Sequence, residues 1–212
     1  MQIAGFSTGP YQTNCYVVVN EEIGHAFVVD PGLGAAPRVQ QILAEQGVQL
    51  SAVLLTHGHL DHVRDAAELA VPVYIHPADA FMLQGGVPEH SRTLFDAHSM
   101  RLPADIRDLE DGATIEVAGV ELTVSHAPGH SPGSVLLSMD EIVFGGDVLF
   151  RGSIGRTDLE YSDPAAMRET LRGPVWELDD TATVLPGHGP VTSVKQERAS
   201  NPFLREANAR RL

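Results

Sequence analysis

The densest group of chemically competent side chains lies in residues 56–62, which read Thr-His-Gly-His-Leu-Asp-His. Three histidines and one aspartate fall within six positions, as His57, His59, Asp61 and His62. Neutral imidazole and carboxylate ligands suit Zn²⁺, and also iron or manganese. A histidine-rich surface turn without metal is the alternative interpretation, but it gives no reason for so dense a cluster. The segment therefore predicts metal chemistry.

The elements around this cluster place it at the end of a strand. The apolar run Ala52–Leu55 directly precedes it and is typical of a short buried strand. The carboxyl end of such a strand is where an open α/β sheet presents its chemistry. Because His57 and His59 are two positions apart, an extended segment sends both imidazoles to the same side. The Ala-rich stretch Val63–Ala70 predicts a helix, and the turn into it would direct the last two members of the cluster toward a second metal.

Three further strand ends carry the same kinds of side chain. Predicted strands end in Gly- or Pro-rich turns within 124–133, 142–147 and 184–189, which offer His130, Asp147 and His188 in that order. Glycines in these turns let the backbone approach closely to whatever lies between them. Four strand ends thus deliver imidazole or carboxylate groups.

The order of these motifs, H-x-H-x-D-H, P-G-H, G-D and P-G-H-G, resembles the metallo-β-lactamase fold superfamily. More narrowly, it resembles the hydroxyacylglutathione hydrolase (glyoxalase II) branch, in its compact bacterial form without the helical carboxy-terminal extension. The likeness runs from Thr13-Asn14-Cys15-Tyr16 and Val29-Asp30-Pro31-Gly32 to Asn201-Pro202-Phe203. The resemblance implies an α/β fold, a four-layer αβ/βα sandwich of two mixed sheets.

The resemblance also implies two divalent metal ions, with zinc expected first and iron or manganese as alternatives. It assigns His57, His59 and His130 to one metal, assigns Asp61, His62 and His188 to the other, and makes Asp147 the bridge. Asp61 and Asp147 are thereby the implied catalytic carboxylates, with Asp61 orienting the attacking hydroxide. Asp30 would accept a hydrogen bond from a ligand imidazole. A turn residue before Pro31 is an equally good interpretation of Asp30.

Two further histidines lie near the motifs. His126 precedes His130 by four positions, and spacing alone does not decide which of them is the ligand, although the family pattern favours His130. We expect His126 to lie in the core or beside the site. His76, which precedes a proline, is expected to cap a helix or pack beside the site.

Arg156 is the candidate substrate contact. In hydroxyacylglutathione hydrolases, the loop after the bridging aspartate supplies a basic residue and a tyrosine to glutathione. Arg156 takes the basic position here, but Asp158 replaces that tyrosine, and Pro190 stands where the family has another. The planar donor fork of arginine suits a carboxylate, whereas an ion pair with Asp158 or Asp163 is the alternative role. These departures weaken the case for glutathione more than the case for thioester hydrolysis.

Length and composition fit one domain spanning residues 1–212. We find no linker or repeat, and the candidate ligands spread from position 57 to 188, so that a cut would separate them. An apolar content of 43% is enough for a sizeable core. The net charge of −14 argues against a nucleic-acid partner, which requires clustered lysine and arginine.

No stretch resembles a signal peptide or the roughly 20 apolar residues of a membrane helix. We therefore expect a cytoplasmic protein without a membrane partner, and the sequence does not predict its oligomeric state. Cys15 is the only cysteine, which excludes an intramolecular disulfide. Its neighbours indicate a small buried thiol in a strand.

Periodicity predicts a series of strands and helices along the chain. Strands are expected at 3–6, 16–20, 26–30, 52–55, 73–75 and 182–185, hairpins at 114–124 and 134–144, and helices at 37–45, 63–70, 164–171 and 194–199. Asp163 and Pro164 form a helix-start signal. Residues 85–111 have the least legible pattern, and we expect helices or loops over the active site there.

These features together predict a binuclear hydrolase of a small anionic thioester, such as the 2-hydroxyacyl thioester S-lactoylglutathione. The alternative is a persulfide dioxygenase, because that class shares the fold and a similar Gly-Arg-Thr-Asp segment. It holds one iron with two histidines and an aspartate, here His57, His130 and Asp147. An inactive binding module is a third hypothesis, disfavoured because every ligand position is filled.

Overall fold

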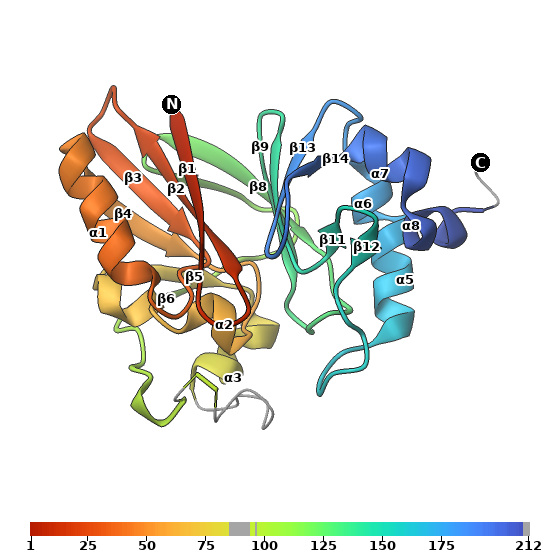
Figure 1. Cartoon of the computed structure of the whole chain (residues 1–212), viewed down its shortest axis with the longest axis horizontal. Helices are drawn as coiled ribbons and strands as arrows, with labels where there is room; N and C mark the ends of the chain where they lie inside the picture. The colour runs from red at the N-terminus through yellow and green to blue at the C-terminus, as the bar shows by residue number, and fades with distance from the viewer. Residues whose placement is uncertain (85–93, 96, 210–212) are drawn as a thin grey trace.

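Two six-stranded mixed sheets pack face to face, and helices cover the outer face of each (Figure 1). The strand orders are β1-β2-β3-β4-β5-β6 and β14-β13-β10-β9-β8-β7. This computed structural model describes residues 1–84, 94–95 and 97–209. The arrangement of helices, sheet, sheet and helices confirms the predicted αβ/βα sandwich.

The first sheet contains β1 (Gln2–Thr8), β2 (Thr13–Asn20), β3 (His25–Val29), β4 (Gln49–Leu54), β5 (Val73–Ile75) and β6 (Ile106–Asp108). Its first three strands are antiparallel, and β3 to β6 are parallel. Helix α1 (Ala35–Gln46) makes the crossover from β3 to β4 and covers the outer face. The parallel strands direct their carboxyl ends to one edge of the sheet.

The second sheet contains β7 (Thr114–Val117), β8 (Val120–His126), β9 (Val135–Met139), β10 (Ile142–Gly146), β13 (Thr183–Pro186) and β14 (Thr192–Ser193). Between β10 and β13 come the small hairpin of β11 (Leu149–Phe150) and β12 (Ser153–Ile154) and helices α5 (Pro164–Arg172) and α6 (Pro174–Glu177). Helices α7 (Val194–Ser200) and α8 (Pro202–Ala207) end the fold on the same side (Figure 1).

Strands β2, β3 and β4 are apolar on both faces because both faces are covered. In β2, Val17 and Val19 pack on the helix side, whereas Tyr16 and Val18 pack against the second sheet. In β4, Val53 packs on the helix side, and Ala52 and Leu54 pack against the second sheet. Two-sided burial explains why these strands are almost continuous apolar runs rather than alternating ones.

The helix predicted at Val63–Ala70 is wrong. The structure has the short helix α2 (Leu60–Val63) and a separate 3₁₀ helix, η1 (Ala66–Leu69). The break occurs at Asp65, whose backbone N–H donates to the carbonyl of Pro31 at 3.0 Å instead of continuing the helical ladder. A tertiary contact therefore overrides the helical pattern of the sequence.

The stretch 85–111 agrees only in part with the expectation of helices or loops. It contains the 3₁₀ helix η3 (Ala97–Ser99) and strand β6, which extends the first sheet by pairing with β5. Residues 85–93 and 96 lie outside the described residues. The 3₁₀ helix η2 (Pro77–Asp79) and helix α3 (Ala80–Leu83) come directly before them. None of the helices in the described part of the chain is long and apolar enough to cross a membrane.

Candidate metal centre

The seven candidate ligands meet where the carboxyl ends of strands from the two sheets come together. The loop after β4 in the first sheet carries His57 and His59, and helix α2, which follows it, carries Asp61 and His62. Loops after β8, β10 and β13 in the second sheet carry His130, Asp147 and His188. Six of the seven are buried, and His188 is partly exposed. The site is therefore built across the junction between the sheets.

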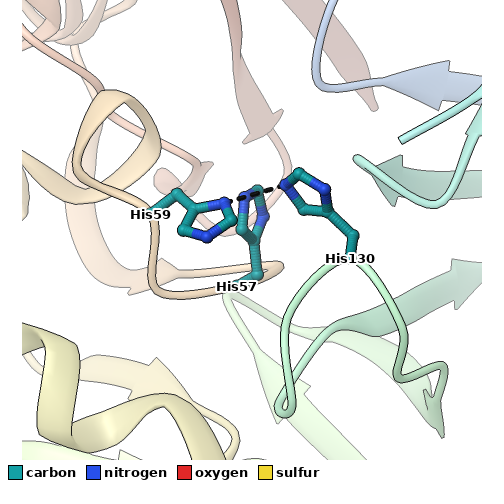
Figure 2. Close-up of side chains that lie close together, drawn as sticks. All are labelled: His57, His59 and His130. Carbon is teal, nitrogen blue, oxygen red and sulfur yellow. Dashed lines mark hydrogen bonds between the residues drawn. The ribbon is translucent and has the colours of Figure 1, made fainter. Parts of the chain in front are cut away.

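Three imidazoles form the first ligand cluster (Figure 2). One nitrogen each from His57, His59 and His130 lies within 4.8 Å of the others. His59 Nδ1 and His130 Nε2 are only 2.8 Å apart. In the described part of the chain, Nε2 of His57 and Nε2 of His59 are buried without a hydrogen-bond partner.

The second cluster is formed by Asp61, His62 and His188. Nε2 of His62 lies 3.3 Å from Nε2 of His188, and Asp61 Oδ2 lies 3.2 Å from the same His188 nitrogen. Two atoms bonded to one tetrahedral Zn²⁺ at ~2.0–2.1 Å stand about 3.3 Å apart. The ligand atoms of this cluster therefore have the spacing that a bound metal ion requires.

Asp147 lies between the two clusters. Its Oδ2 is 3.4 Å from His130 Nε2 of the first and 3.4 Å from His188 Nε2 of the second. Its Oδ1 is 3.4 Å from His62 Nε2 and, among the residues that the structure describes, is buried without a hydrogen-bond partner. An acceptor left unsatisfied in a buried site costs free energy, and a cation removes that cost. The residues present therefore fit a pair of divalent metals with Asp147 between them.

Asp30 lies where the predicted role requires. Its Oδ2 accepts from Nδ1 of His62 at 2.9 Å and from Thr56 Oγ1 at 2.6 Å, while its Oδ1 accepts from the Thr56 backbone amide at 2.8 Å. Because Nδ1 of His62 donates to Asp30, Nε2 is the nitrogen of that ring that faces the cluster. Although burial lowers it, the carboxylates of Asp61, Asp147 and Asp30 raise the pKa of His62 well above its usual range, so a metal bound at Nε2 would displace a proton. Asp30 also has a left-handed φ of 51°, so the turn interpretation describes its backbone.

Other ligand rings are oriented by groups that the sequence analysis missed. His130 Nδ1 donates to the backbone carbonyl of Arg156 at 2.9 Å, and His188 Nδ1 donates to that of Tyr11 at 3.1 Å. The Thr13 hydroxyl donates to Asp61 Oδ2 at 3.0 Å. Carbonyl partners leave no trace in residue type, but Thr13 stands in a motif that the family resemblance includes.

Burial and charge prepare these groups for metal binding. Burial lowers the pKa of His57 well below its usual range, and burial with the neighbouring imidazoles lowers the pKa of His59 to about 3. Both rings are therefore neutral, which is the form that binds metal. Burial alone would raise the pKa of Asp147, but His62 and His188 hold it well below its ordinary value. Asp147 is thus an ionised carboxylate.

A cavity of about 460 Å³ opens onto the metal clusters. Five of the ligands form its floor, and its walls include Tyr11, Phe150, Ile154, Leu159 and Arg156. A small substrate therefore meets carboxylate and imidazole groups on one side and mainly apolar side chains on the other.

Arg156 lines this cavity but is paired in the structure. Its Nε and Nη2 donate to the carboxylate of Asp158 at 2.9 and 3.0 Å. The alternative partner, Asp163, instead accepts the backbone amides of Ala165 and Ala166 at the start of α5. The side chains of Arg156 and Asp158 are 67% and 71% exposed, so this pair contributes little to stability. Arg156 is therefore free to exchange its partner for a substrate anion.

His76 and His126 belong to neither metal cluster in the described part of the chain. Their rings stack at 4.1 Å between centroids. His76 accepts the amide of Ala78 and so caps η2, while His126 Nε2 donates to the carbonyl of Pro132 at 2.8 Å. The capping role expected of His76 is thus confirmed, and the structure places His130 rather than His126 in the first cluster.

The sequence-family model that describes the metallo-beta-lactamase superfamily matches residues 8–188 of this chain. The matched segment includes every candidate ligand. The chain therefore belongs to the metallo-beta-lactamase superfamily, and its class is that of a metal-binding hydrolase.

Similar proteins extend over nearly the whole chain. Hydroxyacylglutathione hydrolase GloC of Haemophilus influenzae is 34% identical, with 92% of this chain and 93% of the relative covered. BLEG-1 B3 metallo-beta-lactamase is 32% identical, with a TM-score of 0.82 and coverage of 96% of this chain and 99% of that one. TTHA1623, solved in a di-iron-bound form, is 35% identical, with a TM-score of 0.78 and coverage of 94% and 99%. The identity of the metal in the present chain stays a prediction.

Proposed function

We propose that this protein is a binuclear metal-dependent hydrolase of small anionic thioesters, of which 2-hydroxyacyl thioesters are the type. The observation that carries the proposal is the pair of ligand clusters joined by Asp147. A dioxygenase holding one iron through His57, His130 and Asp147 would leave the second cluster of Asp61, His62 and His188 without a use. The full-length likeness to GloC supports a thioester as the substrate.

The residues of the site divide the work of such a reaction. When bound, two divalent metal ions supply Lewis acidity and an ionised water at neutral pH. Asp61, held by the Thr13 hydroxyl at 3.0 Å, presents a fixed carboxylate that would accept a hydrogen bond from the attacking hydroxide and so orient it. Asp30 keeps the His62 ring from turning. A thiolate is a good leaving group, so the reaction does not depend on strong acid help from the residues that line the cavity.

The walls of the cavity suit the two halves of a thioester. Phe150, Ile154 and Leu159 offer apolar contact, and Arg156 at the rim offers a planar pair of donors to a carboxylate on the thiol half. Zinc as the metal and the cytoplasm as the location belong to this proposal. Zinc is supported by the candidate ligand set of imidazoles and carboxylates. The cytoplasm is supported by the single cysteine, Cys15, which is free.

The test is a panel of substrates given to the metal-loaded protein. We expect release of free thiol from S-lactoylglutathione and from 2-hydroxyacyl esters of other anionic thiols, with weak discrimination between them. A β-lactam and a glutathione persulfide, the latter followed with an oxygen electrode, serve as competitors. Oxygen consumption with the persulfide and no thioester hydrolysis would overturn the proposal in favour of the dioxygenase.

A further inference from the structure

Asp79 is a fully buried carboxylate outside the ligand set. It stands at the end of η2, in the position before α3 where an aspartate usually caps the helix. Its side chain makes no capping hydrogen bond there. The carboxylate turns instead toward the loops that carry the first metal cluster.

Three donors from two loops converge on this carboxylate. The backbone N–H of Gly58 donates to Oδ2 at 2.8 Å, and the Ser131 hydroxyl donates to the same oxygen at 2.6 Å. The backbone N–H of Gly133 donates to Oδ1 at 2.6 Å. Gly58 stands between His57 and His59, and Ser131 follows His130. One side chain therefore joins the two loops that provide the three imidazoles.

The glycines in these loops make the approach possible. A Cβ at Gly133 would lie 2.7 Å from Asp79 Cγ, and a Cβ at Gly58 would lie 3.0 Å from the Asp79 carbonyl oxygen. Ser131 is held in turn by Ser134, whose Oγ is 2.7 Å from its own. All three donors to Asp79 are neutral, so the contacts are charge-assisted on the acceptor side only.

We propose that Asp79 is a positioning residue for the three-imidazole site. Its carboxylate sets the separation between the His57–His59 loop, after strand β4 of the first sheet, and the His130 loop, after β8 of the second. Among the described residues, its hydrogen bonds go to Gly58, Ser131 and Gly133 and not to a candidate ligand side chain. The inference rests on the metal-binding part of the proposed function and is independent of the substrate.

The effect is confined to one of the two metals. The second cluster is oriented by Asp30, by the Thr13 hydroxyl and by the carbonyl of Tyr11. None of these groups shares a hydrogen bond with Asp79 among the described residues. Loss of the Asp79 carboxylate therefore weakens the three-imidazole site while the Asp61–His62–His188 site keeps its geometry.

Asp79→Asn tests this, because an amide has one acceptor oxygen and its NH₂ group must face a donor in one of the two loops. We expect one of two Zn²⁺ equivalents, measured by competition with a chromophoric chelator, to bind roughly 10- to 100-fold more weakly, as for other partners behind metal ligands. The other equivalent should keep its affinity. The visible spectrum of the Co²⁺-loaded variant should change, and in a His188→Ala background the remaining equivalent should weaken in the same way.

Glu197→Gln is the matched control. Glu197 is also fully buried and accepts from Gly152 N at 2.7 Å, from Asn201 Nδ2 at 3.0 Å and from the Thr192 hydroxyl. Its partners belong to other loops, so this variant should lose stability without losing zinc affinity. If Asp79→Asn does not fold, Ser131→Ala takes its place. It removes one donor, keeps the carboxylate, and should give a smaller loss of zinc affinity at the same equivalent.

Unchanged zinc affinity in both Asp79→Asn and Ser131→Ala would overturn the inference. So would equal losses at both equivalents, or an equal loss in Glu197→Gln. If the native protein itself bound only one equivalent, the binuclear proposal would fail. The positioning role would then still be decided by the affinity of that one equivalent.

Discussion

The metal centre and the rim of its cavity differ in burial and in how firmly their side chains are held. In the centre, His57 and His62 are 1% and 0% exposed. Asp30 and the carbonyl of Arg156 orient two of the ligand rings through hydrogen bonds. At the rim, Tyr11 is 47% exposed, and the side chain of Arg156 is held by an exposed ion pair with Asp158.

From this difference we expect the buried centre to carry out the chemistry and the exposed rim to select the substrate. Buried groups with fixed partners keep the geometry that bond-breaking requires. Exposed side chains change conformation at little cost in free energy. They therefore adapt to a substrate, and each contributes modestly to its binding. Variants of the centre should therefore abolish turnover, whereas variants of the rim should redistribute it among substrates.

The largest effect is expected from Asp147→Ala. Asp147 contacts ligands of both clusters, whereas His188 belongs to one. At saturating metal, kcat/KM of Asp147→Ala should fall far below that of His188→Ala, beyond the roughly 10- to 100-fold typical of partners behind the ligands. Similar, substantial activity in the two variants would show that Asp147 does not join the clusters.

Metal removal should lower the stability of the fold, and the loss should not depend on the rim residue Arg156. A ligand present at 1,000 times its Kd stabilises the fold by about 4 kcal/mol, which is roughly 8–16 °C in Tm for a chain of this size. Chelation should lower the Tm by about this amount in both the native protein and Arg156→Ala. If calorimetry gave the same Tm with and without chelator, the fold would gain no stability from a bound metal, and the expectation would be wrong.

A single hydroxyl at the edge of the centre should have an intermediate effect. Thr13→Val keeps the shape of the side chain but removes the donor to Asp61 Oδ2. A hydrogen bond to a charged group contributes about 1.5–3 kcal/mol, so kcat should fall roughly 10- to 100-fold. Thr13→Ser, which keeps the hydroxyl, should stay close to the native value. Equal losses in the two variants would assign Thr13 a packing role only.

The smallest effect is expected at the rim. Arg156→Ala should raise KM for an anionic thioester about tenfold with little change in kcat, because a remote contact binds the ground state and transition state alike. A neutral thioester should be indifferent. Asp158→Asn frees the arginine and should leave KM unchanged or lower it. If Asp158→Asn raised KM as much as Arg156→Ala, the ion pair itself would be the function of both residues.

The same contrast decides what the sequence could predict. His57, His59, Asp61 and His62 are adjacent in the chain, so their types and spacing already indicated metal ligation. The distant candidate ligands followed from the family resemblance of the motif order, and the structure brings all seven candidates together. The positions of Asp79 and the carbonyls that orient the rings could not be predicted, because they depend on loops meeting across two sheets.

The fold shows a similar division. Long apolar strands such as β2 and β4 were legible because both faces are buried. Strand β6 was missed because three residues carry no usable period, and the Val63–Ala70 helix was wrong because the Asp65 amide bonds to Pro31. Local pattern predicts elements well only where no distant partner competes for the backbone.

The most direct test of the account is the number of metal ions that the protein holds. Elemental analysis of protein loaded to saturation and freed of excess metal should give two ions per chain, and His188→Ala should hold only one tightly. A maximum of one ion in the native protein under metal-replete conditions would contradict the binuclear centre and favour a mononuclear enzyme of the same fold.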